Sequence, residues 1–106
     1  MAQGRALTAL AAWVEHRTVR APAALRQRVL DHVRAAAATG NPPADLARAA
    51  HHSLAGVLEA PGGRTVALDL LAADGLITLA LLRQAEDDPS LLVAFARSLT
   101  ELSAPE

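Results

Sequence analysis

Two aspartates interrupt the most apolar stretch of the chain, ALDLLAADGLITLALL (residues 67–82), and carboxylates in such surroundings are candidates for acid–base chemistry. Asp69 and Asp74 are five residues apart, so on a helix their side chains diverge by about 140°. They therefore cannot act together on one substrate as a carboxylate pair. We expect Asp69 to be solvated, because it shares a narrow polar sector of the helical wheel with Ala72, Ala80 and Arg83.

Asp74 lies at the edge of the apolar surface, where we predict a structural polar role rather than a catalytic one. Asp74 and Gly75 could form a kink in which Asp74 caps a second helical segment. Alternatively the helix is continuous, and Asp74 is buried against an arginine of the first or second helix. The sequence leaves both interpretations open and assigns no catalytic residue.

The four histidines are the natural candidates for metal binding. Metal sites on helices favour ligands three or four positions apart, which share a face. Within the expected helices no His, Asp or Glu has another such residue at that spacing, and the chain has no cysteine. On the wheel His16 and His52 face solvent, whereas His32 and His51 flank apolar stripes and could meet across helices. We therefore predict no metal and no cofactor.

A glycine turn is the best candidate for binding an anion. Backbone N–H groups at a helix N-terminus can hold a phosphate, and an arginine follows the glycines. The candidate residues are Gly62, Gly63, Arg64 and Thr65. Their spacing is not that of a Walker A loop, and none of the serines stands in a G-x-S-x-G pattern.

The composition indicates an all-α protein. Its 106 residues include 26 alanines and 18 leucines, which favour helices, with few of the β-branched residues that strands prefer. Proline, glycine and Asp88 divide the chain into a compact bundle of about five helices, followed by a frayed tail at about 103–106. We predict one helical domain over 1–106, with helices at about 3–18, 22–38, 43–59, 65–86 and 89–103.

The helix at about 65–86 is apolar on most sides, which predicts a central position in the bundle or in a subunit interface. One stripe on it is formed by Leu68, Leu71, Gly75, Leu79 and Leu82, and a second by Val66, Leu70, Ile77 and Leu81. Gly75 would let another helix approach closely. We therefore expect a homodimer with this helix or the last one in the interface, and a fully covered monomer is the alternative.

Charge is unevenly distributed although the net charge is only −1. Residues 1–40 carry six arginines and two acids, and the rest carries four arginines and nine acids. We expect the two halves to attract each other. Binding of nucleic acid is the weaker interpretation, since the six arginines are dispersed and the sequence has no lysine and no aromatic stacking platform. The N-terminus lacks a signal-cleavage pattern, and Asp69 and Asp74 oppose a membrane span, so we expect a cytoplasmic, non-membrane protein of bacterial origin.

Two short segments have resemblances. LAADGLITLAL (71–81) resembles a helix of trans-isoprenyl diphosphate synthases, but the DDxxD motif of those enzymes is absent. APAALRQRVLDHV (21–33) is similar to helices of bacterial anti-sigma factors, but their His/Cys zinc motif is absent. Neither segment carries a site residue over to this chain.

We therefore expect a small non-enzymatic interaction or regulatory module with an unknown protein partner. One alternative is a small-ligand or anion-binding domain that uses the Gly62–Arg64 turn. A second is a DNA-associated regulator that uses the arginine-rich N-terminal half.

Overall fold

The computed structural model describes residues 2–36, 38–59 and 62–103. Within these ranges it contains five α-helices, one short 3-10 helix and no strand, which confirms the all-α prediction. The observed bounds lie close to the expected ones. The elements are α1 (Ala2–Arg17), α2 (Ala23–Ala35), α3 (Pro42–Glu59), α4 (Arg64–Asp87), η1 (Pro89–Leu91) and α5 (Leu92–Ser103).

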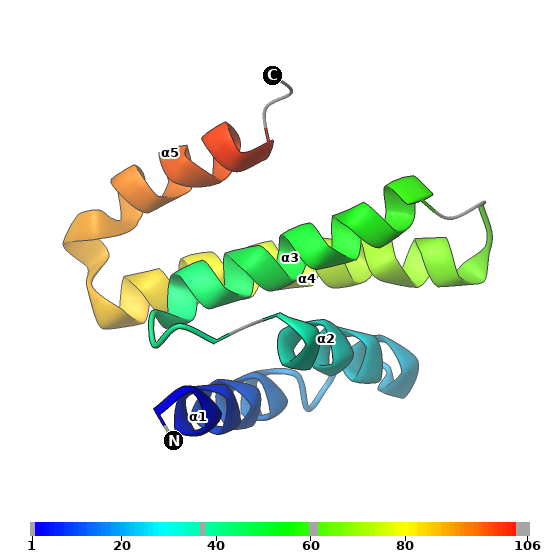
Figure 1. Ribbon diagram of the computed structural model, residues 1–106, viewed down its shortest axis with the longest axis horizontal. Coiled ribbons are helices and arrows are strands. Elements are labelled where there is room, and N and C mark those ends of the chain that lie inside the picture. Colours follow the sequence, from blue (N-terminus) through cyan, green and yellow to red (C-terminus); the bar gives the residue numbers. More distant parts are fainter. Residues whose placement is uncertain (1, 37, 60–61, 104–106) are drawn as a thin grey trace.

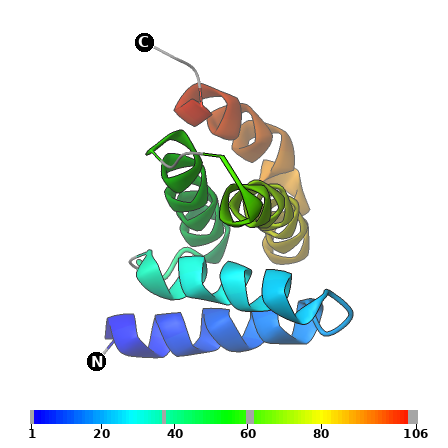
Figure 2. The same ribbon diagram turned by 90° about the vertical axis from the view of Figure 1, so that its right-hand side faces the viewer.

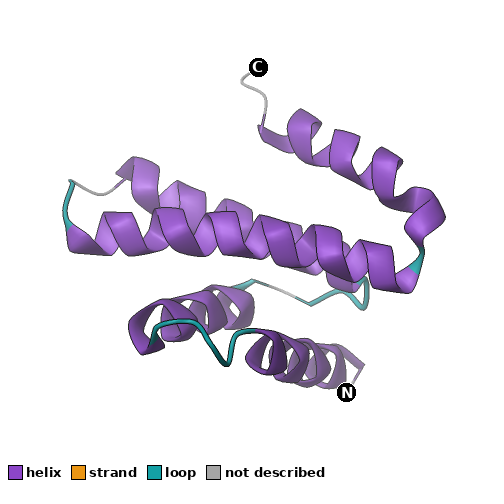
Figure 3. Ribbon diagram, turned by 180° about the vertical axis from the view of Figure 1, so that it is seen from behind, coloured by secondary structure: helices purple, strands orange, loops and turns teal. Residues whose placement is uncertain are grey.

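The helices form two hairpins and a final helix that folds back. α3 and α4 run antiparallel side by side, and α5 returns above them (Figure 1). α1 and α2 form the second hairpin, which crosses beneath the first, with α2 in contact with α3 and α4 (Figures 2 and 3). α4 packs against α2, α3 and α5, so its predicted central position is confirmed.

Glycine, proline and aspartate set the helix ends, as the sequence indicates. Gly63 precedes α4 with a φ of 141°, a backbone conformation that favours glycine. Asp88 follows the last residue of α4 and accepts a hydrogen bond from the Ser90 N–H at 3.1 Å, so it also caps η1. α4 itself continues without a break through Asp74 and Gly75, which excludes the kink.

The orientation of α4 differs from the prediction. Asp69, Ala72 and Ala80, which the helical wheel assigns to a solvated sector, are instead on the buried face of α4. Their small side chains let α2 and α3 approach the α4 backbone closely, and the carboxylate finds partners there. The core around them is built from Leu10, Val14, Val29, Leu30, Val33, Leu46, Ala49, Ala50, Leu76 and Leu79.

α4 is also, among the described residues, the one helix long and apolar enough to cross a membrane by length and composition. Its most apolar window has a mean hydropathy of 1.9, and a third of that window is buried inside the protein. Core helices meet the same criterion.

Candidate functional site

Asp69 is the centre of a buried polar cluster that joins three helices. Its carboxylate, 5% exposed, accepts two hydrogen bonds from the Arg28 guanidinium of α2, at 2.5 Å to Oδ1 and 3.0 Å to Oδ2. His32, one turn after Arg28 and also buried, contacts Oδ1 through Nε2 at 2.8 Å. On α3, Ser53 Oγ donates to the Asp69 carbonyl oxygen at 2.6 Å. The expectation of a solvated Asp69 is therefore wrong.

The Arg28 guanidinium dominates the electrostatics of the cluster. Its hydrogen bonds lower the pKa of the Asp69 carboxyl to about 2, against the opposing effect of burial, with a further lowering contribution from the His32 hydrogen bond. The same contact raises the pKa of Arg28. Asp69 is thus an anion at neutral pH, and no described buried side-chain polar atom of the protein lacks a hydrogen-bond partner.

The cluster continues from His32 to the surface through His52 of α3. The two Nδ1 atoms are 2.9 Å apart and the ring centroids 5.1 Å, so the nitrogens face each other along the line between the rings. An ionised carboxylate only accepts hydrogen bonds, so His32 must donate from Nε2. When both rings are neutral, His32 Nδ1 is then an acceptor and His52 Nδ1 must donate. The Nε2 of the exposed residue His52 then keeps its lone pair.

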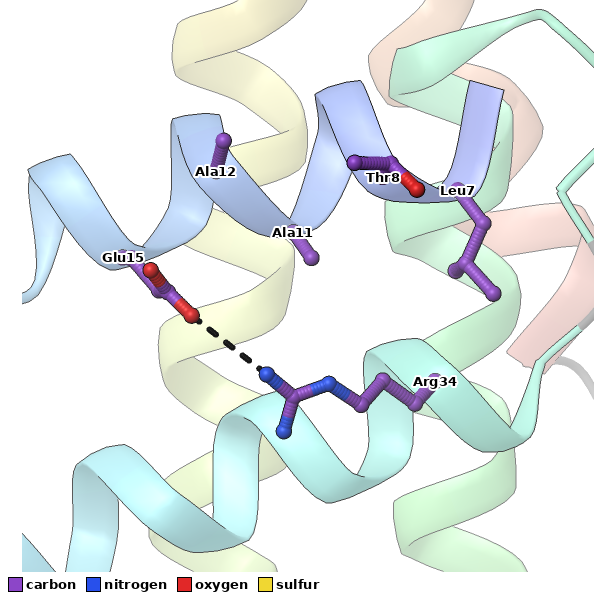
Figure 4. Close-up of a pocket in the computed structure, with 6 residues that line it drawn as sticks. All are labelled: Leu7, Thr8, Ala11, Ala12, Glu15 and Arg34. Atoms are coloured by element: carbon purple, nitrogen blue, oxygen red, sulfur yellow. Dashed lines mark hydrogen bonds and ion pairs between the residues drawn. The ribbon is translucent and has the colours of Figure 1, made fainter. Parts of the chain in front are cut away.

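None of the three best-defined hollows among the described residues is lined by His32, His52 or Asp69. A hollow of about 430 Å³ lies between α1 and α2, where Glu15 of α1 and Arg34 of α2 pair at 3.3 Å (Figure 4). Its other lining residues are Leu7, Thr8, Ala11 and Ala12. The one carboxylate there is already paired and no histidine lines the hollow, so the acid–base groups of the cluster are separate from this concave surface.

The structure brings together residues that the sequence did not connect. The prediction that His32 meets His51 is wrong, because His52 occupies that place. Arg28 was not singled out, although Arg28 and His32 stand four residues apart on one helical face and so can share an anion. An arginine of the second helix does pair with an aspartate, but with Asp69 and not with Asp74. Among the described residues no group of three or more His, Asp or Glu could hold a metal ion.

Asp74 lies on the opposite face of α4. It is exposed on a continuous helix, and its carbonyl accepts the Thr78 hydroxyl at 3.0 Å. Neither of its two predicted structural roles fits this position. The role predicted for Asp74, a carboxylate held inside the bundle by an arginine, belongs to Asp69.

The outward face of α4 is apolar and uncovered. Figure 2 shows α3 on one side of α4, α1 and α2 beneath and α5 above, with no helix against the remaining side. Leu71 is 54% exposed and Leu82 38% exposed, and a Cβ added at Gly75 would have no atom within 4 Å. Leu68 is half-buried, so four residues of the predicted interface stripe lie on this surface, whereas Leu79 is buried in the core.

The remaining candidates are dispersed. The residues of the predicted anion-binding turn are all exposed at the start of α4, and none of the three hollows includes them. They are Gly62, Gly63, Arg64 and Thr65.

Most of the N-terminal arginines are engaged within the protein. Arg17 pairs with Glu86 of α4 at 2.7 Å, Arg26 donates to the Glu15 carbonyl, and Arg28 and Arg34 hold Asp69 and Glu15. Two of these contacts, Arg17–Glu86 and Arg28–Asp69, join the two halves as expected. The contacts of Arg26 and Arg34 with Glu15 lie within the N-terminal half, and all four leave fewer arginines for a nucleic acid.

Comparison of the chain with protein-family models finds no match. Comparison with curated proteins and with solved structures finds none either. The function is therefore argued from the geometry.

Proposed function

We propose that this protein is a helical interaction module whose binding surface is the outward face of α4, and that its partner is an α-helix with an apolar stripe. The observation that carries the proposal is the row of exposed or half-buried leucines around Gly75 on one side of α4. Contiguous apolar surface that a monomer leaves uncovered marks interaction sites. The open space above Gly75 suits a partner helix, because a missing side chain permits close backbone approach.

The polar cluster supports this proposal by fixing the orientation of α4. A bidentate arginine–carboxylate contact has a defined geometry. The contacts of Asp69 with Arg28, His32 and Ser53 hold one face of α4 against α2 and α3. The leucines on the opposite face are thereby held toward solvent. In this proposal the cluster has a structural role and the protein is not an enzyme.

Site-specific photo-crosslinking in the native cell tests the proposal without knowledge of the partner. A photoreactive phenylalanine analogue replaces Leu71 in one variant and Leu82 in another. Leu58 of α3, which is 86% exposed, is the matched control because it is a surface leucine outside the stripe. We expect protein adducts from positions 71 and 82 and none from position 58. Equal adducts at all three positions, or none at any, would overturn the proposal.

A further inference from the structure

The uncovered face of α4 has the spacing of a two-helix coiled coil. The exposed and half-buried residues along it follow one another at alternating intervals of three and four, the a and d spacing of a heptad repeat. They are Leu68, Leu71, Gly75, Thr78, Leu82 and Ala85. Leu79 of the predicted stripe is buried, and Thr78 and Ala85 complete the stripe in its place.

We propose that the helix that docks here is α4 of a second copy of this chain, antiparallel to the first, about a two-fold axis between Gly75 and Thr78. This inference rests on the proposed function. In this register Leu71 faces Leu82 of the second copy and Gly75 faces Thr78, and the two-fold axis repeats each pair. The two smallest contacts lie next to the axis, where the helices come closest, and the leucine pairs flank them.

Charge selects the antiparallel direction. The start of α4 carries the exposed Arg64. Three acids follow one another at its other end: Glu86, Asp87 and Asp88. Glu86 pairs with Arg17 and Asp87 with Arg83, so this end keeps a net negative charge. An antiparallel pair brings Arg64 of each copy to the acidic end of the other, and the two helix dipoles oppose each other favourably. A parallel pair would instead place arginine beside arginine and the acidic ends side by side. The ends of α4 are therefore complementary to a second α4 only when the two run in opposite directions.

The oligomeric state and one matched pair of variants test the surface. We expect sedimentation equilibrium at tens of micromolar to give twice the chain mass of 11.0 kDa. Leu71→Glu should weaken the dimer at least about tenfold, because the new carboxylate would be buried without a partner. Leu58→Glu makes the same change outside the stripe and should change the dissociation constant less than about twofold. Circular dichroism checks that both variants keep their helicity.

Spin labels on the cysteine-free chain test the direction. Ala67→Cys and Asp74→Cys place labels at exposed positions that flank the stripe. With a rise of 1.5 Å per residue and a helix separation of about 9 Å, the antiparallel register separates equivalent backbone sites by about 30 Å at residue 67 and about 12 Å at residue 74. A parallel pair gives the same short distance at both.

The possible outcomes distinguish a failure of the antiparallel dimer from a failure of the proposed interaction surface. A dimer that Leu71→Glu dissociates, with unequal label distances, supports the antiparallel pair. Equal distances, a dimer insensitive to Leu71→Glu, or a monomer at hundreds of micromolar overturns it. If the dimer is overturned and position 71 crosslinks in the cell only to a protein of another mass, the outward face of α4 is still an interaction surface. Its partner is then a different protein and not a second copy of this chain. If position 71 crosslinks to nothing, both proposals fail.

Discussion

The two faces of α4 do not sort residues by hydrophobicity alone. The inward face carries the carboxylate of Asp69 and three alanines beside Leu76 and Leu79, whereas Leu71 and Leu82 lie on the outward face. Small residues permit the closest packing of helices, and a charge can be buried when every polar atom around it is satisfied. The orientation of a helix with two apolar sides therefore depends on more than the apolar area that its leucines bury. Close packing of its small residues and the hydrogen-bond partners of its polar residues also decide which side faces the core.

The largest effect should come from removing the inward carboxylate. Asp69→Ala leaves Arg28 and His32 without their anion. Because the Arg28 side chain is 35% exposed and can regain water, we expect the variant to lower the free energy of unfolding by about 2–3 kcal/mol. Urea denaturation measures this change. Asp74→Ala is the matched control, since it removes the same side chain from the outward face and should change stability by less than about 0.5 kcal/mol. Equal losses in the two variants would show that the faces do not differ as described.

Replacing both partners sharpens the same comparison. Arg28→Met together with Asp69→Leu removes the buried charge and its counterion, so we expect the double variant to be more stable than Asp69→Ala. A double variant as unstable as the single one would indicate that packing, rather than the unpaired charge, causes the loss.

Lowering the pH should remove the stabilisation that the Asp69 carboxylate provides. The folded pKa of Asp69 is about 2 and its ordinary value is 3.8, so the carboxylate stabilises the fold fully above about pH 4. That stabilisation, about 2 kcal/mol, is lost as the pH falls through the folded value. Urea denaturation between pH 2 and 6 measures it against Asp69→Asn, which cannot titrate at this position. Parallel pH profiles for the two proteins would contradict the prediction.

A smaller effect should follow from the hydrogen bond between α3 and α4. Ser53→Ala removes the hydroxyl donor of the Asp69 carbonyl oxygen and should cost about 1 kcal/mol of stability. Ser98→Ala on α5 is the control, because its hydroxyl bonds within its own helix and is only partly buried. Thermal melts that rank Ser98→Ala as the worse variant would contradict this assignment.

The smallest effect belongs to the outward face of the isolated chain. Leu71→Gln should change the stability of the monomer by less than about 0.5 kcal/mol when the chain is dilute enough to dissociate. A loss of several kcal/mol under those conditions would show that Leu71 packs inside the monomer, and the two faces would then both be core.

The helices could be predicted from the sequence because their signals are local. Alanine and leucine favour helix at every position they occupy, and Gly63, Asp88 and Pro89 mark the ends of α4 and the start of η1. The orientation of α4 is not a local property. Leucines outnumber polar residues around most of the circumference of α4. The helical wheel therefore places the leucine stripes in the core and Asp69 at the surface.

The sequence contains a signal for the Asp69 cluster, but only when the patterns of α2 and α4 are considered together. On α4 the alanines share the face of Asp69, which is typical of a close-packed surface rather than a solvated one. On α2, Arg28 and His32 present two hydrogen-bond donors one turn apart, which requires an acceptor if that face is buried. Which aspartate supplies the acceptor depends on how α2 crosses α4, and spacing along the chain does not contain that information.

The hydrogen-bond chain from Asp69 through His32 to His52 also makes His52 a reporter of folding. The chain links α4 to α2 and α2 to α3, across 37 and 20 residues of sequence. When both rings are neutral, this chain keeps the proton of His52 on Nδ1 while all three helices are docked, and undocking any one of them lets the ring carry that proton on either nitrogen. Nitrogen chemical shifts of this one exposed ring therefore follow the assembly of three helices, without a label in the core.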